Sequence, residues 1–126
     1  MKQIVIDFIP QSEQRFNDVG QVGDYYETPN TIHFKITQFK RPVYSMACAL
    51  HELVEKFRND QLGIKDADVD QWDIDNADHP DPGLIKEAPY HKTHMEADAI
   101  ERSFVVMAGG DWAEYEEQID EVFEHE

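Results

Sequence analysis

The chain has 126 residues, with 27 Asp or Glu against 11 Lys or Arg, which gives a formal net charge of −16 at pH 7. Its length is near the commonest domain size and 40% of its residues are hydrophobic, so we expect one folded domain over residues 1–126. The charge excludes nucleic-acid binding through a general phosphate-contact surface, because such a surface consists of Lys and Arg. A basic protein or peptide partner is compatible with it.

Membrane, secreted and disulfide-rich classes are also excluded by the sequence. The longest nearly apolar run, residues 43–53, is far too short to cross a bilayer. Asp7 interrupts the N-terminal apolar residues before the core of a signal peptide would be complete, so we expect a cytoplasmic protein. Cys48 is the single cysteine, which rules out a disulfide framework and a cysteine-based zinc site. A metal ion would need His and carboxylate ligands.

The negative charge is concentrated in the second half of the chain. Residues 1–59 hold seven acids and seven bases, whereas residues 60–126 hold 20 acids and 4 bases, a difference of −16. The first half is therefore neutral, and the second half carries the whole net charge.

Segments near the N-terminus have the composition of strands. Residues 2–9 are rich in β-branched and aromatic side chains. In residues 31–39, apolar and polar side chains alternate with the period of a strand that has one buried face. A short strand is also expected at Tyr25 and Tyr26. Residues 1–42 therefore predict a small antiparallel sheet.

A helix and a long loop are expected after the strands. Pro42 can occupy the first turn of a helix, and apolar residues at spacings of three and four predict that this helix spans residues 43–59. Gly63 is placed to end it. Residues 64–92 contain many acids and three prolines, which predicts a long acidic loop with a single helical turn near residues 69–72.

Capping patterns place two more helices in residues 93–124. Thr93 and Asp111 are each followed three residues later by Glu, which is the pattern of a capping box. Two glycines near residue 109 separate the two helices. The predicted fold class is α+β, with a small antiparallel sheet in the N-terminal half packed with about three helices.

The strongest candidate site lies in the predicted helix over residues 43–59. His51, Glu52 and Glu55 form an H-E-x-x-E motif, and residues four apart share a helix face, so His51 and Glu55 can bind one ion. Glu52 is placed beside them as a general base. Glu replaces the second His of H-E-x-x-H zinc hydrolases and admits harder ions. The expected cofactor is a divalent metal, Zn²⁺ or else Mn²⁺, Mg²⁺ or Ni²⁺, and no organic cofactor.

A second polar cluster lies in the next predicted helix. It contains His91, His94, Asp98 and Glu101, of which His94 and Asp98 are four apart. His94 and Glu101 are separated by about 10 Å along a helix axis, so we expect one of them to bind the ion and the other to support it or face the substrate. The predicted metal ligands come from both helices: His51, Glu55, His94 and Glu101.

Structural roles for these residues stay open at the level of sequence. Glu52 and Lys56 have the spacing of an ordinary surface ion pair. His51 borders an apolar stripe, where a hydrogen-bonded histidine is common. An ion bound by the cluster would stabilise a small core even without catalysis.

Short motifs in a fixed order carry a resemblance to a known family. They are residues 13–16 (EQRF), 22–25 (VGDY), 51–55 (HELVE), 69–73 (VDQWD) and 88–90 (APY), then His94, Ala97, Glu101 and Trp112. In this order the chain resembles a family of small uncharacterised proteins encoded by bacteriophages and prophages. The resemblance implies action in the cytoplasm of the host bacterium and implies no particular activity. The strand followed by HELVE also resembles the smallest zincin-like metallohydrolases.

Two classes of function follow from these features. The first is a zincin-like metal-dependent hydrolase acting on a peptide or cationic substrate, because the acidic second half would repel nucleotides. The second is an inhibitory binding protein without catalysis, whose acids mimic phosphates in the basic groove of a host enzyme. Its carboxylates would lie at the last predicted helix: Asp111, Glu114, Glu116, Glu117, Asp120, Glu121 and Glu124.

Overall fold

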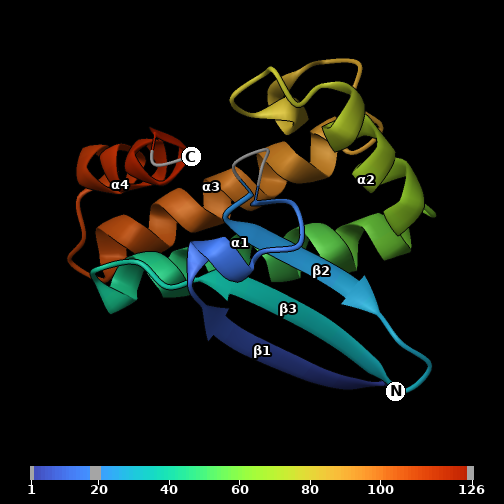
Figure 1. Cartoon of the computed structure of the whole chain (residues 1–126), viewed down its shortest axis with the longest axis horizontal. Helices are drawn as coiled ribbons and strands as arrows, with labels where there is room; N and C mark the ends of the chain where they lie inside the picture. The colour runs from blue at the N-terminus through green and yellow to red at the C-terminus, as the bar shows by residue number, and fades with distance from the viewer. Residues whose placement is uncertain (1, 18–20, 125–126) are drawn as a thin grey trace.

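The computed structural model describes residues 2–17 and 21–124. These residues form a small sheet and four α-helices (Figure 1). The elements are β1 (Gln3–Ile9), η1 (Gln11–Glu13), β2 (Gly23–Glu27), β3 (Thr31–Thr37), α1 (Pro42–Gln61), α2 (Asp66–Asp75), η3 (Pro82–Leu84), α3 (His91–Met107) and α4 (Trp112–Glu124). None of the helices in this part of the chain combines the length and apolar character needed to cross a bilayer.

The sheet has the strand order β1-β3-β2, so β3 lies in the centre. β2 and β3 form an antiparallel hairpin in which Tyr25 is opposite Phe34. β1 runs parallel to β3, with Ile6 opposite Phe34. The predicted α+β class and the small sheet are confirmed, but the sheet is mixed rather than wholly antiparallel.

The parallel pairing has a topological cause that strand periodicity does not reveal. An alternating pattern identifies a strand and its buried face, but it carries no information about the neighbours of that strand. The hairpin leaves one edge of β3 free, and β1 occupies that edge instead of pairing with β2. The chain reverses direction twice between these strands, once before β2 and once in the hairpin of β2 and β3, so β1 and β3 point the same way.

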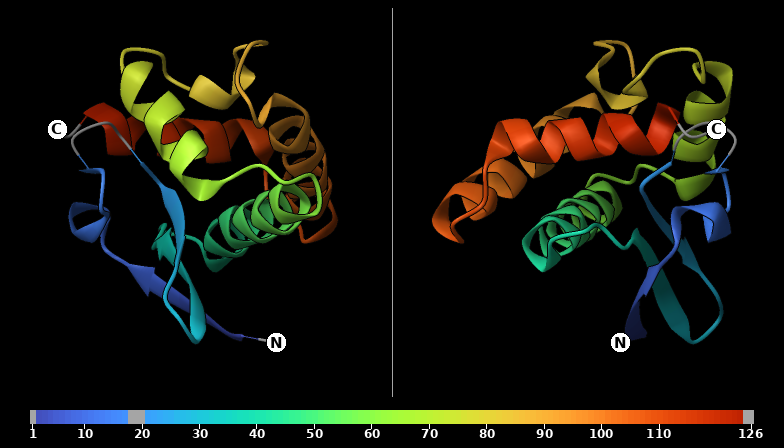
Figure 2. Two further views of the ribbon diagram at one scale, coloured as in Figure 1. Left: turned by 90° about the vertical axis from the view of Figure 1, so that its right-hand side faces the viewer. Right: turned by 60° about the vertical axis from the view of Figure 1, so that its left-hand side comes forward.

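Helix α1 lies between the sheet and α3 (Figure 2). One side of α1 packs on β2 and β3, and another side packs along α3. The main core lies at these contacts and includes the buried side chains Tyr25, Phe34, Ile36, Tyr44, Val105 and Tyr115. A smaller core joins Val69 of α2 to Ala88 and Tyr90.

The region predicted as a long acidic loop, residues 64–92, contains α2 and η3. The prediction of one helical turn was too short, because only Val69 of α2 is buried and no apolar stripe marks the helix. Asp66 and Asp68 lie in its first turn, where negative charge favours a helix N-terminus.

The predicted caps of the last two helices differ in outcome. α3 begins at His91 rather than after Thr93, which is buried and donates hydrogen bonds to Asn59 Oδ1 and to the Tyr90 carbonyl. Thr93 therefore joins α3 to α1 instead of capping. At α4, Asp111 Oδ1 accepts the backbone N–H of Glu114 at 2.9 Å, as the capping pattern predicts.

Gly63 follows α1 in the left-handed region, with φ 71°, as expected for a residue that ends a helix. A Cβ at this position would meet no atom within 4 Å, so substitution changes backbone preference alone. Gly63→Ala should lower the free energy of unfolding by about 1 kcal/mol, measured by urea unfolding. Gly63→Asn should recover part of that loss, because Asn tolerates this conformation. An unchanged stability in Gly63→Ala would contradict this role.

Candidate metal centre

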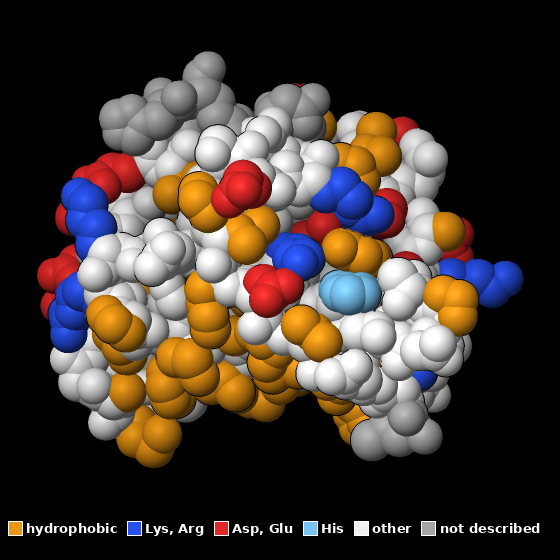
Figure 3. Space-filling model, turned by 60° about the horizontal axis from the view of Figure 1, so that its bottom comes forward, with side chains coloured by type: hydrophobic (Ala, Val, Ile, Leu, Met, Phe, Trp, Pro, Cys, Tyr) orange, Lys and Arg blue, Asp and Glu red, His pale blue; other side chains and the backbone are white. Residues whose placement is uncertain are grey.

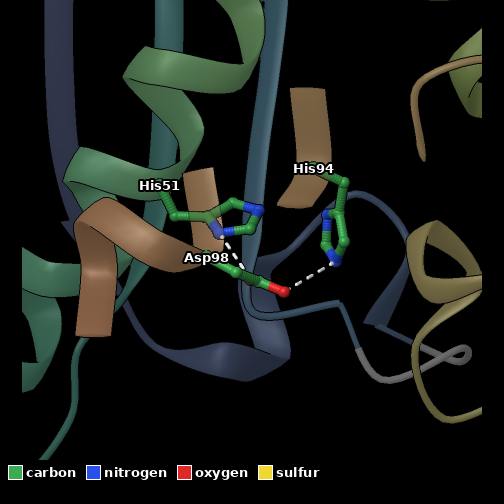
Figure 4. A group of neighbouring side chains, drawn as sticks. All are labelled: His51, His94 and Asp98. Atoms are coloured by element: carbon green, nitrogen blue, oxygen red, sulfur yellow. Dashed lines mark ion pairs between the residues drawn. The ribbon is translucent and has the colours of Figure 1, made fainter. Parts of the chain in front are cut away.

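Two packed helices each present a histidine and a carboxylate four residues apart. His51 and Glu55 lie on α1, and His94 and Asp98 lie on α3. This spacing puts each pair on one face of its helix, and the packing of α1 along α3 brings the two pairs together. Figure 4 shows His51, His94 and Asp98 converging from the two helices. One donor atom from each of these three residues lies within 4.8 Å of the other two.

The four side chains form a closed ring in which imidazoles and carboxylates alternate. Glu55 Oε2 lies 3.1 Å from His51 Nε2 and 3.0 Å from His94 Nδ1. Asp98 closes the ring, with Oδ1 3.1 Å from His51 Nδ1 and Oδ2 3.6 Å from His94 Nε2. Every imidazole nitrogen therefore faces a carboxylate, which fixes the orientation of both rings.

Two further carboxylates contact this ring from outside. Glu101 Oε1 lies 3.0 Å from His51 Nδ1, and Asp81, in the loop before η3, lies 3.1 Å from His94 Nε2. The buried hydroxyl of Tyr115 in α4 donates to Glu101 Oε2 at 2.5 Å. Glu101 and Asp81 thus face the same imidazole nitrogens as Asp98. Glu55 faces the other nitrogen of each ring, which is the position of a carboxylate that orients a ligating histidine.

A buried chain of hydrogen bonds holds the other oxygen of Glu55. Tyr25 of β2 donates to Glu55 Oε1 at 3.1 Å, and Asn59 donates to the Tyr25 hydroxyl at 3.1 Å. Thr93 of α3 in turn donates to Asn59 Oδ1. Because Oε1 is held in this way, Oε2 remains directed at the two histidines.

Charge and burial set the protonation of the cluster when no ion is bound. Burial lowers the pKa of His94, but Asp81 and Glu55 outweigh burial and raise that pKa to about 10. Burial also lowers the pKa of His51. The surrounding carboxylates, chiefly Asp98, outweigh burial and hold that pKa well above the ordinary value. Burial raises the pKa of Glu55, yet its hydrogen bonds to the two histidines lower it to about 2. Both imidazoles are thus protonated at neutral pH.

The donor set fits a divalent transition-metal ion. Two imidazoles and one carboxylate are the donors of catalytic zinc sites and of non-haem iron sites. Ligating imidazoles are neutral, so an ion would take the place of two protons. Exchanging two protons for one divalent ion leaves the net charge of the buried cluster unchanged, so the residues present can hold an ion without new charge imbalance.

The cluster lines a cavity of about 460 Å³. Glu52 lines the same cavity, and burial together with the charge of Glu55 raises its pKa well above the ordinary value. Gly23 of β2 gives it room, since a Cβ there would lie 2.5 Å from Glu52 Oε1. Among the described residues, the cavity wall has no Lys or Arg and ten carboxylates: Asp24, Glu52, Glu55, Asp70, Asp73, Asp81, Asp98, Glu101, Glu116 and Asp120.

All the residues predicted for the site lie at this cavity: His51, Glu52, Glu55, His94 and Glu101. Glu101 lies behind His51, and Asp98 is the α3 carboxylate that groups with both histidines. The four-residue spacing of His94 and Asp98 was the signal for Asp98. No spacing in the sequence points to Asp81. His91, the remaining histidine of the α3 cluster, contacts the Gly83 carbonyl instead.

Some of the carboxylates expected at the last helix line the cavity, and others form ion pairs with basic residues. Glu116 and Asp120 line the cavity. Glu114 and Glu121 pair with the two basic residues that precede α1, at 3.2 and 3.6 Å respectively. The side chain of Glu124 lies outside the described residues, and mimicry of a row of phosphates by these carboxylates stays a prediction.

Comparison with known proteins adds no relative to this picture. No protein-family model matches the chain, and searches of curated proteins and of solved structures return no match. The functional argument therefore rests on the geometry of the site.

Gly83 of η3 offers a test that leaves every donor group in place. A Cβ at this position would lie 2.5 Å from Cγ of His94, so Gly83→Ala should displace that ring. We expect Zn²⁺ affinity, measured by calorimetry, to fall by about tenfold or more. Gly23→Ala, which displaces Glu52 instead, is the matched control and should keep the affinity. Equal affinity in Gly83→Ala and the wild type would argue against His94 as a ligand.

The pH dependence of stability tests the protonation of the ring. The pKa of His94 is about 10 against an ordinary 6.5, so its stabilising contribution is complete below pH 6.5 and is lost as pH rises through 10. The pKa of Glu55 is about 2 against 4.5, so its contribution is complete above pH 4.5 and is lost as pH falls through 2.

Thermal unfolding with a chelator present should therefore show greatest stability between pH 4.5 and 6.5 and a decline toward pH 10. The decline should shrink in His94→Asn, which cannot gain the proton. A wild-type Tm that stays constant as pH rises toward 10 would contradict the protonated ring.

Proposed function

We propose that the chain binds a divalent transition-metal ion through His51, His94 and Asp98 and acts as a metal-dependent hydrolase. The observation that carries the proposal is the convergence of these donors, within 4.8 Å of one another, at the wall of a cavity. Catalytic zinc sites have three protein ligands and keep one position for water or substrate. A cavity beside the ligands gives a substrate access, which a purely structural ion does not require.

Glu52 is the proposed general base. The bound ion would lower the pKa of the attacking water and polarise the scissile carbonyl group. Glu52 would accept the proton of that water, because it lines the same cavity as the ligands and because burial and the charge of Glu55 raise its pKa, which makes it a stronger base. Glu55, which faces the nitrogen of each imidazole opposite to the one that faces Asp98, would orient both rings. Glu101 and Asp81, which face the same nitrogens as Asp98, would stand beside it as further donors.

A peptide or another cationic molecule is the proposed substrate. The carboxylates of the cavity wall attract positive charge and repel phosphate groups. Arg15, which does not itself line the cavity, offsets two of these carboxylates by ion pairs to Asp24 and Asp70 at 2.8 and 3.2 Å, and the wall keeps a large excess of carboxylates over bases. A basic peptide segment therefore fits the electrostatics of the cavity better than a nucleotide does.

Elemental analysis of the protein purified without a histidine tag tests the metal site. After incubation with Zn²⁺, Mn²⁺, Ni²⁺ or Fe²⁺, the wild type should retain about one equivalent of an ion. His51→Ala and Asp98→Asn should lose it, while His33→Ala, in β3 and not among the residues that line the cavity, should not. An ion content near zero in the wild type, or unchanged in His51→Ala, would overturn the metal site.

Glu52→Gln separates catalysis from a structural ion. The variant should bind the ion and gain thermal stability from it as the wild type does, because Glu52 is not a proposed ligand. Its hydrolysis of a library of basic peptides, followed by mass spectrometry, should fall by about 100-fold or more. Full activity in Glu52→Gln would reject the base. An ion-loaded wild type that raises Tm but cleaves no peptide would assign the ion a structural role.

A further inference from the structure

On the side of α1 away from α3, the sheet has an edge with an uncovered apolar face. β1 is an edge strand, since β3 is its sheet neighbour. Its residues Ile4, Ile6 and Phe8 are the partners of Ile32, Phe34 and Ile36 in β3, so they share the face on which α1 packs. Phe34 and Ile36 are buried, yet the β1 side chains are 47%, 38% and 42% exposed respectively. α1 therefore covers β3 but leaves β1 open.

An apolar groove of about 480 Å³ lies between β1 and α1. Its lining includes Ile4, Ile32, Leu53 and Phe57. Phe57 is 63% exposed. Figure 3 shows hydrophobic side chains gathered over this side of the molecule, around a hollow. Contiguous exposed apolar surface with this shape is typical of a protein interface.

The backbone of β1 is also arranged to accept another strand. Gln3 donates its N–H to Asn30, and the Ile9 carbonyl accepts from Gln38, so the odd-numbered residues direct their backbone groups toward β3. Backbone directions alternate along a strand, so the N–H and C=O groups of Ile4, Ile6 and Phe8 point to the outer edge. β1 has no Pro, Gly or Lys of the kind that protects many edge strands, and its one charged residue, Asp7, is paired with Lys35.

We propose that β1 pairs with β1 of a second copy of this chain, antiparallel and around a two-fold axis at Ile6, to form a six-stranded sheet. In this register Ile6 lies opposite the partner's Ile6, and Ile4 lies opposite the partner's Phe8. The outward-pointing residues then form hydrogen-bonded pairs with one another. Their side chains form β-branched and aromatic cross-strand pairs on the apolar face. Phe57 of each α1 packs over the joined face.

Charge favours a second copy as the occupant of this edge. Residues 1–59 hold seven acids and seven bases. The charges on the adjoining strands are paired, Asp7 with Lys35 and Lys2 with Glu27, each at 2.6 Å. The proposed register places Asp7 opposite the partner's Val5, which avoids a like-charge pair. The helices with the excess acid, α2 to α4, lie away from β1, so two copies meet here with least repulsion (Figure 1).

Sedimentation velocity tests the proposal on the wild type and two matched variants. The wild type should be a dimer, and the dimer should strengthen between about 0.05 and about 0.5 M salt, because salt screens the repulsion between acidic copies. Ile6→Lys should be monomeric, since it places two like charges at the two-fold axis. Ile74→Lys makes the same charge change on α2, at a side chain 49% exposed, and should remain dimeric.

A further measurement separates loss of pairing from loss of folding. Ile6→Lys should keep the circular dichroism spectrum of the wild type. Hydrogen exchange at the amides of Ile4, Ile6 and Phe8 should slow as wild-type concentration rises, and it should be independent of concentration in Ile6→Lys. A wild type that is monomeric at high salt and high concentration would overturn the proposal. A dimer that persists in a folded Ile6→Lys would overturn it too.

Discussion

The burial of two histidines among carboxylates, between α1 and α3, is the constraint on which the rest of the structure depends. Ionised groups are stable away from water only where partners surround them. No single element supplies enough partners here, so β2 provides Tyr25, α4 provides Tyr115 and the loop before η3 provides Asp81. The cluster therefore joins parts of the fold that are far apart in the sequence, and it defines one wall of the cavity.

The same constraint accounts for the small residues around the cluster. Gly23 and Gly83 approach Glu52 and His94 so closely that a Cβ at either position would lie 2.5 Å from the facing side chain. Ala97, between His94 and Glu101 on α3, is fully buried. Larger residues at these positions would occupy the space that the ionisable groups need, because protein interiors are close-packed. The small residues at these positions thus leave the space that the ionisable side chains of the site occupy.

Helix spacing led to the centre of the site, because helix geometry converts sequence separation into direction. His51 and Glu55 follow from that rule. The choice between Asp98 and Glu101 does not, since it depends on how α3 is rotated against α1, which packing decides. Asp81 lies in a loop, and its position depends on the tertiary fold. Sequence patterns did not predict the parallel pairing of β1 or the length of α2 for a related reason. Both features depend on neighbouring elements, which a local pattern does not encode.

Charge distribution separates the two surfaces of interest. Both halves of the chain line the cavity, and the acidic half supplies seven of its ten carboxylates, while the neutral half forms the sheet and its free edge. An ion that replaces two protons in the ring leaves the net charge of the chain as it was. The proposed binding of an ion at the cavity would therefore leave the long-range repulsion between two copies at β1 unaltered. Because Ile4, Ile6 and Phe8 are not among the residues that line the cavity, pairing of two sheets would leave its wall unchanged. The proposed ion site and the proposed pairing edge thus lie on opposite sides of α1, and we expect occupation of one to be independent of the other.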